Sequence, residues 1–296
     1  LVVMKIAKEK ERIALMSGPG STPITNEQCN DVSVHYTYDT YALANGTAKA
    51  VTKQGGKSWF FLTADYAFGQ ALEKDASAVV SANGGKVLGS VKTPLNASDF
   101  SSFMLQAQNS KAQILGLANA GGDTINSIKA AREFGITGAK GQKVAALLMF
   151  LTDVHSLGLR QAQGLMFSEG FYWDMDDQTR ALSTRFEKLH KGYKPTMVQA
   201  GVYSSTLHYL RTVATAKTDD WKVVAKKMRE LPIKDDVMRN ASIRPDGRVV
   251  HDMLLVEVKK PAQSKAAWDY YNILGTIPAN TAFMPLAQSQ CSLVKK

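Results

Sequence analysis

The chain has 296 residues, of which 45% are hydrophobic and 21% are charged, as is ordinary for a globular protein. This length favours two lobes over a single core. The net charge of +10 could suggest nucleic-acid binding, but the basic residues are spread along the chain. No basic stripe alternates with aromatic residues, so we expect no nucleic acid as a partner. No apolar run is long enough to span a membrane.

The printed sequence begins with Leu1 rather than Met, and its first eleven residues have the pattern of the end of a helix. We therefore expect an amino-terminal portion, with any secretory signal, to be missing. A strand is predicted next, over residues 12–17. It leads into a loop rich in glycine and proline, residues 18–23.

This loop is a candidate anion site. Glycine and proline keep its backbone out of a helix and leave amide N–H groups unpaired, while Ser17, Ser21 and Thr22 add hydroxyl groups. Unpaired amides at the carboxyl end of a strand can bind a carboxylate. An ordinary loop that caps its own next turn is the simpler alternative.

A strand–turn–helix pattern occurs twice between residues 57 and 135. The predicted strands are 57–63, 86–91 and 112–118, and the predicted helices are 70–82, 99–108 and 124–134. Such alternation predicts a parallel sheet with right-handed crossovers. Ligands bind beyond the carboxyl ends of such strands, so the turns 64–69 and 119–123 are candidate binding segments.

The remaining elements follow from the same patterns. An extended link over residues 34–39 precedes a helix over 40–54, and we interpret the link as a crossover between lobes. Further predictions are strands at 142–149, 164–169, 249–258 and 270–277, an exit turn at 150–154, helices at 177–191, 196–216 and 219–231, and a surface tail at 278–296. The aromatic residues 171–173 are either core anchors or one wall of a pocket, and their position favours the pocket.

No catalytic motif is present, so an enzyme, a metal site and a cofactor are not predicted. Asp153 and His155 are an acid–base pair close in sequence, and a structural role explains them more simply. Cys29 and Cys291 are either two unrelated thiols or one disulfide that ties the tail to the first lobe. The disulfide would imply an oxidising compartment, and the sequence leaves both possibilities open.

Four segments together resemble the periplasmic solute-binding proteins of branched-chain amino acid ABC transporters, the leucine/isoleucine/valine-binding type. They are Ser17-Gly-Pro-Gly-Ser-Thr22, His35-Tyr-Thr-Tyr-Asp39, Phe61-Leu-Thr-Ala-Asp-Tyr-Ala-Phe-Gly69 and Asn119-Ala-Gly-Gly-Asp123. The resemblance covers essentially the whole chain, from about the end of the family's first third onward. It implies a two-lobed α/β fold of type I, with parallel sheets flanked by helices and three crossovers.

The resemblance also implies where the lobes and crossovers fall. Lobe 1, which would be incomplete, comprises residues 1–36 and 170–245, and lobe 2 comprises residues 37–169 and 246–296. The crossovers are expected near residues 36–39, 167–172 and 244–249.

A small ligand would be clamped between the lobes. The residues expected to bind it are Ser17, Gly20, Ser21 and Thr22 at its carboxylate, and Tyr66, Phe68, Asn119, Ala120, Gly121, Phe150, Tyr172 and Trp173 around its body. The family places an acidic residue near 148–150 to pair with the ammonium group of an amino acid, and only apolar residues stand there in this chain.

The expected function is therefore that of a periplasmic, monomeric binding protein. It would deliver a branched-chain amino acid or an aromatic acid to a membrane ABC permease. The alternatives are the ligand-sensing domain of a receptor, or an α/β enzyme that uses Asp153 and His155.

Overall fold

The computed structural model describes residues 1–137 and 141–295, and the chain divides into two compact units. Unit 1 comprises residues 1–39, 170–253 and 277–295, and unit 2 comprises residues 40–169 and 254–276. The chain passes between the units after Asp39, Glu169, Met253 and Thr276. The first two passages lie where crossovers were predicted, whereas the third lies beyond the predicted range of 244–249.

The structure differs from the prediction for part of residues 246–296, which were all expected in lobe 2. Residues 246–253 and 277–295 lie in unit 1, whereas 254–276 lie in unit 2 as predicted. Two interactions explain the difference. β9 (Val249–Val250) pairs with β8 (Ser242–Ile243) of unit 1, and Cys291 forms a disulfide with Cys29, with their Cα atoms 5.6 Å apart. The disulfide that the sequence left open is thus present.

Unit 2 is built on a four-stranded sheet in the order β4-β3-β5-β6. The strands are β3 (Ser58–Ala64), β4 (Lys86–Thr93), β5 (Ile114–Ala118) and β6 (Lys143–Ala146), and all neighbours are parallel. β5 is buried along its whole length, which is why its sequence is a continuous run of apolar residues and glycine. The two βα cycles predicted from the sequence are confirmed.

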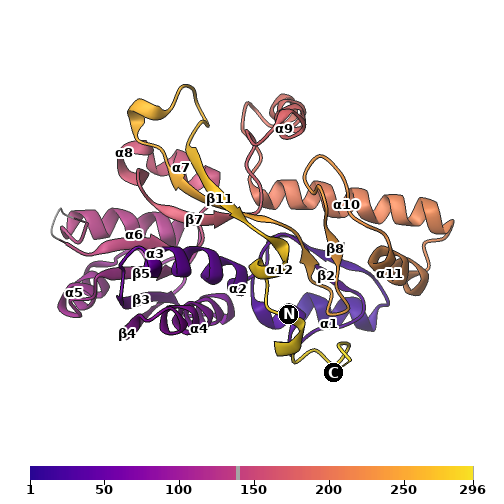
Figure 1. The fold of residues 1–296 in the computed structure, drawn as a ribbon, viewed down its shortest axis with the longest axis horizontal. Coiled ribbons are helices and arrows are strands. Elements are labelled where there is room, and N and C mark those ends of the chain that lie inside the picture. The colour runs from indigo at the N-terminus through magenta and orange to yellow at the C-terminus, as the bar shows by residue number, and fades with distance from the viewer. Residues whose placement is uncertain (138–140, 296) are drawn as a thin grey trace. The chain divides into compact units, whose positions relative to one another are not determined.

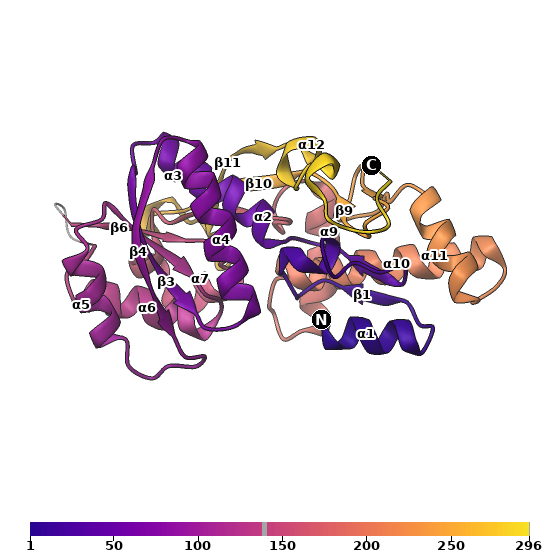
Figure 2. The same ribbon diagram turned by 90° about the horizontal axis from the view of Figure 1, so that it is seen from below.

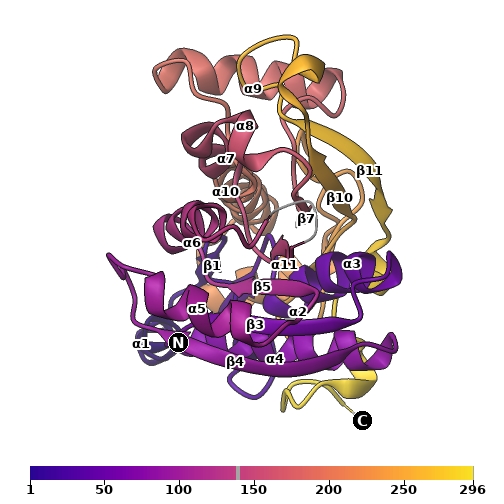
Figure 3. The same ribbon diagram turned by 90° about the vertical axis from the view of Figure 1, so that its left-hand side faces the viewer.

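The helices of these cycles cover both faces of the sheet. α4 (Ala67–Ala82) connects β3 to β4, α5 (Ser101–Asn109) connects β4 to β5, and α6 (Gly122–Glu133) connects β5 to β6. The connection through α4 runs from β3 outward to the edge strand β4, whereas the connection through α6 runs from β5 outward to the opposite edge strand, β6. Right-handed crossovers therefore place α4 on one face and α5 and α6 on the opposite face, as Figure 3 shows. The order reverses between β3 and β5, so their carboxyl ends form a topological switch point.

The rest of unit 2 is less regular than expected. A helical run with a π-turn in its middle comprises α2 (Thr40–Leu43), η2 (Ala44–Ala48) and α3 (Lys49–Lys53). A second sheet has the order β11-β10-β7, from β7 (Met166–Glu169), β10 (Met253–Val258) and β11 (Tyr271–Ile277), and β7 and β10 are antiparallel. The predicted exit turn at 150–154 is instead the start of α7 (Leu151–Leu157), which α8 (Leu159–Ala162) follows. A short 3-10 turn, η3 (Pro261–Gln263), lies between β10 and β11.

Unit 1 contains fewer strands than unit 2, and it contains α10, the longest helix among the described residues (Figure 1). Its elements are α1 (Val2–Glu9), β1 (Ala14–Met16), η1 (Thr22–Thr25), β2 (Ser33–His35), α9 (Asp177–Leu189), α10 (Met197–Ala216), α11 (Trp221–Glu230), β8, β9, α12 (Ala279–Ala282) and η4 (Leu286–Gln288). β1 and β2 are parallel, with Ala14 opposite Ser33. α10 and α11 pack against each other beside these strands (Figure 2).

A fully buried arginine fixes the segment through which the chain leaves unit 1. Arg248 donates hydrogen bonds to the carbonyl oxygens of Tyr36 and Tyr38, and its guanidinium lies 3.4 Å from the Asp39 carboxylate. The ring of Phe283 covers it, 4.7 Å from the guanidinium carbon. Burial lowers the pKa of Arg248 to about 10, and the charge of Asp39 opposes this shift. Residues 36–39 are thus held in one conformation.

Candidate functional site

The loop after β1 presents main-chain amides at the carboxyl end of a strand. Among the described residues, the amide N–H groups of Gly20 and Ser21 have no hydrogen-bond acceptor. Both residues are buried, and Ser21 precedes η1 without capping it through its side chain. Buried donors without acceptors are costly, so these amides are suited to donate hydrogen bonds to an anionic oxygen.

Two side chains hold the carbonyl groups of this loop. Tyr38 donates its hydroxyl to the Gly18 oxygen, and His35 Nε2 lies 2.7 Å from the Pro19 oxygen. Because a carbonyl only accepts, His35 must carry its proton on Nε2. Burial, with help from the charge of Arg248, lowers the pKa of His35 well below its usual value, which keeps the ring neutral. The loop is therefore anchored through its carbonyls.

The hydroxyl of Ser17 is engaged inside unit 1. It donates to the Val198 oxygen at 2.9 Å and lies 2.7 Å from the hydroxyl of Thr37. A Cβ atom at Gly201 of α10 would overlap both hydroxyl oxygens, so only glycine allows this contact. Four residues were expected to bind the carboxylate of the ligand. The hydroxyl of Ser17 thus has a structural role, whereas Gly20, Ser21 and Thr22 remain candidates for this contact.

The aromatic residues after β7 lie in the same unit. Tyr172 and Trp173 have ring centroids 5.9 Å apart in an edge-to-face arrangement. The ammonium of Lys194 lies 4.5 Å from the centroid of a Trp173 ring and 2.7 Å from the Glu187 carboxylate. These contacts hold Trp173 in place, and Tyr172 is almost fully buried. Thr37 lies against both this segment and the loop. A Cβ atom at Gly170 would lie only 3.0 Å from the Thr37 methyl group, and the Thr37 hydroxyl contacts Ser17.

In unit 2, the expected aromatic pair lies at the topological switch point. Tyr66 follows β3, and its ring centroid is 5.9 Å from that of Phe68 in the first turn of α4. The next residue, Gly69, contacts the ends of both central strands. A Cβ atom there would overlap the Ala64 oxygen and lie 3.0 Å from the Ala118 oxygen. Glycine at this position lets α4 start against the sheet, which places both rings at its carboxyl edge.

The turn after β5 lies at the same edge. The side chain of Asn119 is buried, and both of its polar atoms are bonded: its amide nitrogen donates to Ser127 and its oxygen accepts from Thr124. Gly121 has a φ of +58°, and a side chain at Gly121 or Gly122 would meet open space. The backbone at Ala120 and Gly121 is therefore available to a ligand, whereas Asn119 fixes the start of α6.

A carboxylate stands beside this turn that the sequence reasoning missed. Asp123, in the first turn of α6, accepts a hydrogen bond from the Asn96 amide at 3.2 Å. Burial raises the pKa of the Tyr66 phenol, and the negative charge of Asp123 raises it further. Asp123 is thus within electrostatic range of Tyr66. The turn predicted at 119–123 included this residue, but the sequence gave its carboxylate no role of its own.

The carboxylates of Asp153 and Glu169, near Phe150, are both engaged within the fold. The amide of Phe150 donates to the Asp153 carboxylate at 2.9 Å, and burial raises the pKa of Asp153 to about 6. Glu169, at the end of β7, accepts from the Tyr271 hydroxyl at 3.3 Å. Burial raises the pKa of Glu169 well above its usual value, and the Asp153 charge adds to the effect. Burial therefore favours the protonated form of Glu169.

Asp153 and His155 contact different parts of the chain. The His155 ring is stacked on Trp268 at 4.0 Å and bonds the Tyr270 hydroxyl through Nδ1 at 2.8 Å. Asp153 caps α7 instead. The structure therefore gives no acid–base pair at this position. In the part of the chain that the structure describes, no cluster of three or more His, Cys, Asp or Glu residues could hold a metal ion.

Comparisons with known proteins agree with this arrangement. A sequence model of the family described as "Periplasmic binding protein" matches residues 1–265. The chain belongs to the periplasmic binding protein family. A solved periplasmic binding protein from Burkholderia mallei is 53% identical over 99% of this chain and 77% of its own, with a TM-score of 0.96.

Two further relatives share the fold over almost the whole chain. A branched-chain amino acid ABC transporter periplasmic ligand-binding protein from Burkholderia xenovorans LB400 is 37% identical, over 99% of this chain and 78% of its own, with a TM-score of 0.88. An amino acid ABC transporter substrate-binding protein from Pseudomonas fluorescens Pf-5 is 25% identical, over 98% and 77%, with a TM-score of 0.86. A search of curated proteins found no match.

Membership of this family confirms the expected type I α/β fold. Periplasmic binding proteins bind small solutes for ABC transporters, work with membrane permeases and are located in the periplasm; they are not a family of enzymes. In the described part of this periplasmic binding protein, no helix is both long and apolar enough to cross a bilayer.

Proposed function

We propose that this chain binds a small monocarboxylate, either a branched-chain amino acid or an aromatic acid, and delivers it to an ABC permease. The observation that carries the proposal is the pair of amides at Gly20 and Ser21, which have no acceptor among the described residues. Fixed amide donors form charge-assisted hydrogen bonds with a carboxylate. The relative from Burkholderia xenovorans, named as a branched-chain amino acid transporter component, supports the amino-acid class.

The body of the ligand would contact the aromatic pair Tyr66 and Phe68 and the open backbone at Ala120 and Gly121. Tyr66 and Phe68 offer apolar ring faces, and the Tyr66 hydroxyl offers one polar group. These residues stand at the switch point of the unit 2 sheet, the usual ligand position in an open α/β sheet. Phe150, Tyr172 and Trp173 are further candidates for contacts with an apolar body.

One matched pair of variants tests the carboxylate site. Ser21 has φ −66° and ψ 125°, which proline can adopt without strain. Ser21→Pro removes the amide N–H and the hydroxyl together, whereas Ser21→Ala removes only the hydroxyl. We expect Ser21→Pro to weaken binding roughly tenfold or more and Ser21→Ala to weaken it less, measured by calorimetry. Equal binding by the wild type and Ser21→Pro would contradict the proposal.

The ligand class is decided by a second experiment. A thermal-shift screen with leucine, valine, benzoate and 4-hydroxybenzoate should raise the Tm for at least one compound. Asp123 is the carboxylate near Tyr66 that could pair with an ammonium group. If the ligand is an amino acid, Asp123→Asn should weaken binding roughly tenfold. If it is an aromatic acid, Asp123→Asn should leave binding unchanged or improve it. A screen without any stabilising compound would count against both classes.

A further inference from the structure

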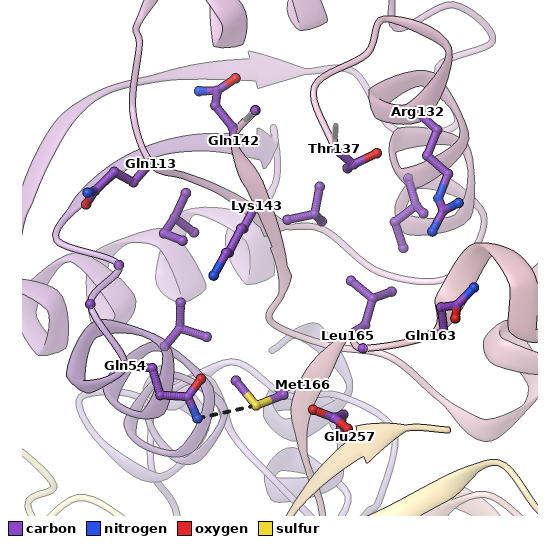
Figure 4. Close-up of a pocket in the computed structure, with 18 of the residues that line it drawn as sticks. Gln54, Gln113, Arg132, Thr137, Gln142, Lys143, Gln163, Leu165, Met166 and Glu257 are labelled. Carbon is purple, nitrogen blue, oxygen red and sulfur yellow. Dashed lines mark hydrogen bonds between the residues drawn. The ribbon is translucent and has the colours of Figure 1, made fainter. Parts of the chain in front are cut away.

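A cavity lies in unit 2, away from the candidate ligand residues. Its volume is about 750 Å³, and its lining residues come from the amino ends of β5, β6 and β7 and the segments around them (Figure 4). The candidate turn at Asn119–Gly121 lies at the other end of β5. Five residues of strand separate the two edges by about 17 Å. The cavity is therefore distinct from the proposed carboxylate site.

Two cations and one acid surround this cavity. Lys143, the first residue of β6, extends into the open centre, and Arg132 reaches down from the last turn of α6 (Figure 4). Glu257 of β10 stands opposite Met166 in the register of the antiparallel pair. Within residues 1–137 and 141–295, none of these three side chains forms an ion pair, whereas Lys92 and Lys259 of the same unit are both paired.

The uncharged lining offers weak polar groups and an apolar floor. Among the described residues, the side-chain hydrogen bond of Gln54 runs from its amide nitrogen to the Met166 thioether at 3.7 Å, and a thioether is a weak acceptor. Val51 and Val144, which are half-buried, form part of the floor. A Cβ atom at Gly56 would lie 2.8 Å from Ile114, so this glycine permits the close packing beside the cavity.

We propose that this cavity binds a small amphiphilic monoanion, that is, one carboxylate or sulfonate group on an apolar body. Lys143 and Arg132 attract the anionic group from opposite sides of the cavity, and the apolar body covers the half-buried Val51 and Val144. Glu257 repels a second negative charge, which restricts the site to monoanions. The site acts independently of the solute carried by the protein.

The probe for the test is 8-anilinonaphthalene-1-sulfonate, an aromatic monosulfonate whose fluorescence rises on binding. It is titrated into the full chain and into the double variant Lys143→Gln/Arg132→Gln. We expect the double variant to bind roughly tenfold more weakly, because the two positive charges that attract the anion are lost. Glu257→Gln should bind more tightly than the wild type. The matched control is Lys86→Gln/Lys111→Gln, which removes two exposed cations near the same edge that do not line the cavity.

Two results would overturn the inference. One is an equal loss of affinity in the control and the double variant, since it would show only non-specific attraction to a basic surface. The other comes from a ¹H–¹⁵N spectrum of the full chain recorded with the probe. We expect amide shifts at Gln54, Lys143 and Met166. Shifts confined to Tyr66, Phe68 and Gly121 would place the probe at the proposed solute site instead, which would leave the proposed function standing and remove this one.

Discussion

The hydroxyl groups of Ser17 and Thr37 lie 2.7 Å apart, and Thr37 belongs to the segment through which the chain leaves unit 1. This hydrogen bond connects the candidate carboxylate loop to that segment. Arg248 fixes the same segment from its other side, through the carbonyls of Tyr36 and Tyr38. The geometry of the loop therefore depends on residues that contact no ligand in our proposal.

Replacing Gly201 should disturb this connection. A methyl group there overlaps the hydroxyl oxygens of Ser17 and Thr37, so we expect Gly201→Ala to lower the free energy of unfolding by about 1–3 kcal/mol. Gly122→Ala is the control, because a Cβ at this helical residue meets nothing within 4 Å. The control should be neutral or stabilising by up to about 1 kcal/mol. Urea denaturation of both variants measures the difference, and equal effects would disprove the role of Gly201.

Replacing Arg248 should strongly destabilise unit 1. Arg248→Met leaves the buried Asp39 carboxylate without its cation, which costs about 3–5 kcal/mol. The double variant Arg248→Met/Asp39→Asn removes the unpaired charge and should recover part of this loss. Denaturation curves of the two single variants and the double variant give the coupling energy. Strict additivity would show that the pair does not interact.

Asp153 should make stability depend on pH. Its carboxyl keeps its proton up to a pH of about 6 in the folded chain, because it is buried, but only up to about 4 in the unfolded chain. Between these values the folded state binds more protons, so this contribution to stability decreases as pH rises. Asp153→Asn cannot ionise. The free energy of unfolding of Asp153→Asn minus that of the wild type should therefore rise by about 1–3 kcal/mol between pH 4 and pH 6.5.

The measurement compares Tm or urea midpoints of the two proteins at several pH values. The comparison is needed because the buried histidines act in the opposite direction. Burial, together with the charge of Arg248, lowers the pKa of His251 to about 4, so its contribution is lost as pH falls below about 6.5. The difference between wild type and Asp153→Asn cancels this term. A difference that stays constant with pH would rule out the raised pKa.

Loss of the disulfide should destabilise unit 1 in particular. Cys29 and Cys291 are 262 residues apart, and a bridge of this kind typically contributes about 2–5 kcal/mol. We expect Cys29→Ser/Cys291→Ser to lower the Tm of unit 1, with the tail released. Dithiothreitol should lower the Tm of the wild type and have no effect on the double variant. Protection of unit 2 amides from hydrogen exchange should remain unchanged.

The sequence by itself determined the βα cycles of unit 2. Their strands are apolar runs, and apolar residues recur about every 3.6 residues in their helices. Local periodicity was therefore sufficient to predict β3, α4, β5 and α6. The order of loops around Ser17–Thr22 and Tyr66–Phe68 was also enough to indicate the family, which the comparisons confirmed. The strands and helices follow from patterns within each segment, and the family is indicated by the order of short segments along the chain.

Only the tertiary structure decided which side chains are already occupied. Ser17 and Asn119 look like ligand residues in the sequence, yet their polar atoms bond Val198, Thr124 and Ser127. The last residues belong to unit 1 because Cys29 and Cys291 meet across 262 residues. Hydrogen bonds and bridges between distant residues leave no periodic signal, because nothing near either partner in the chain shows what the fold brings beside it.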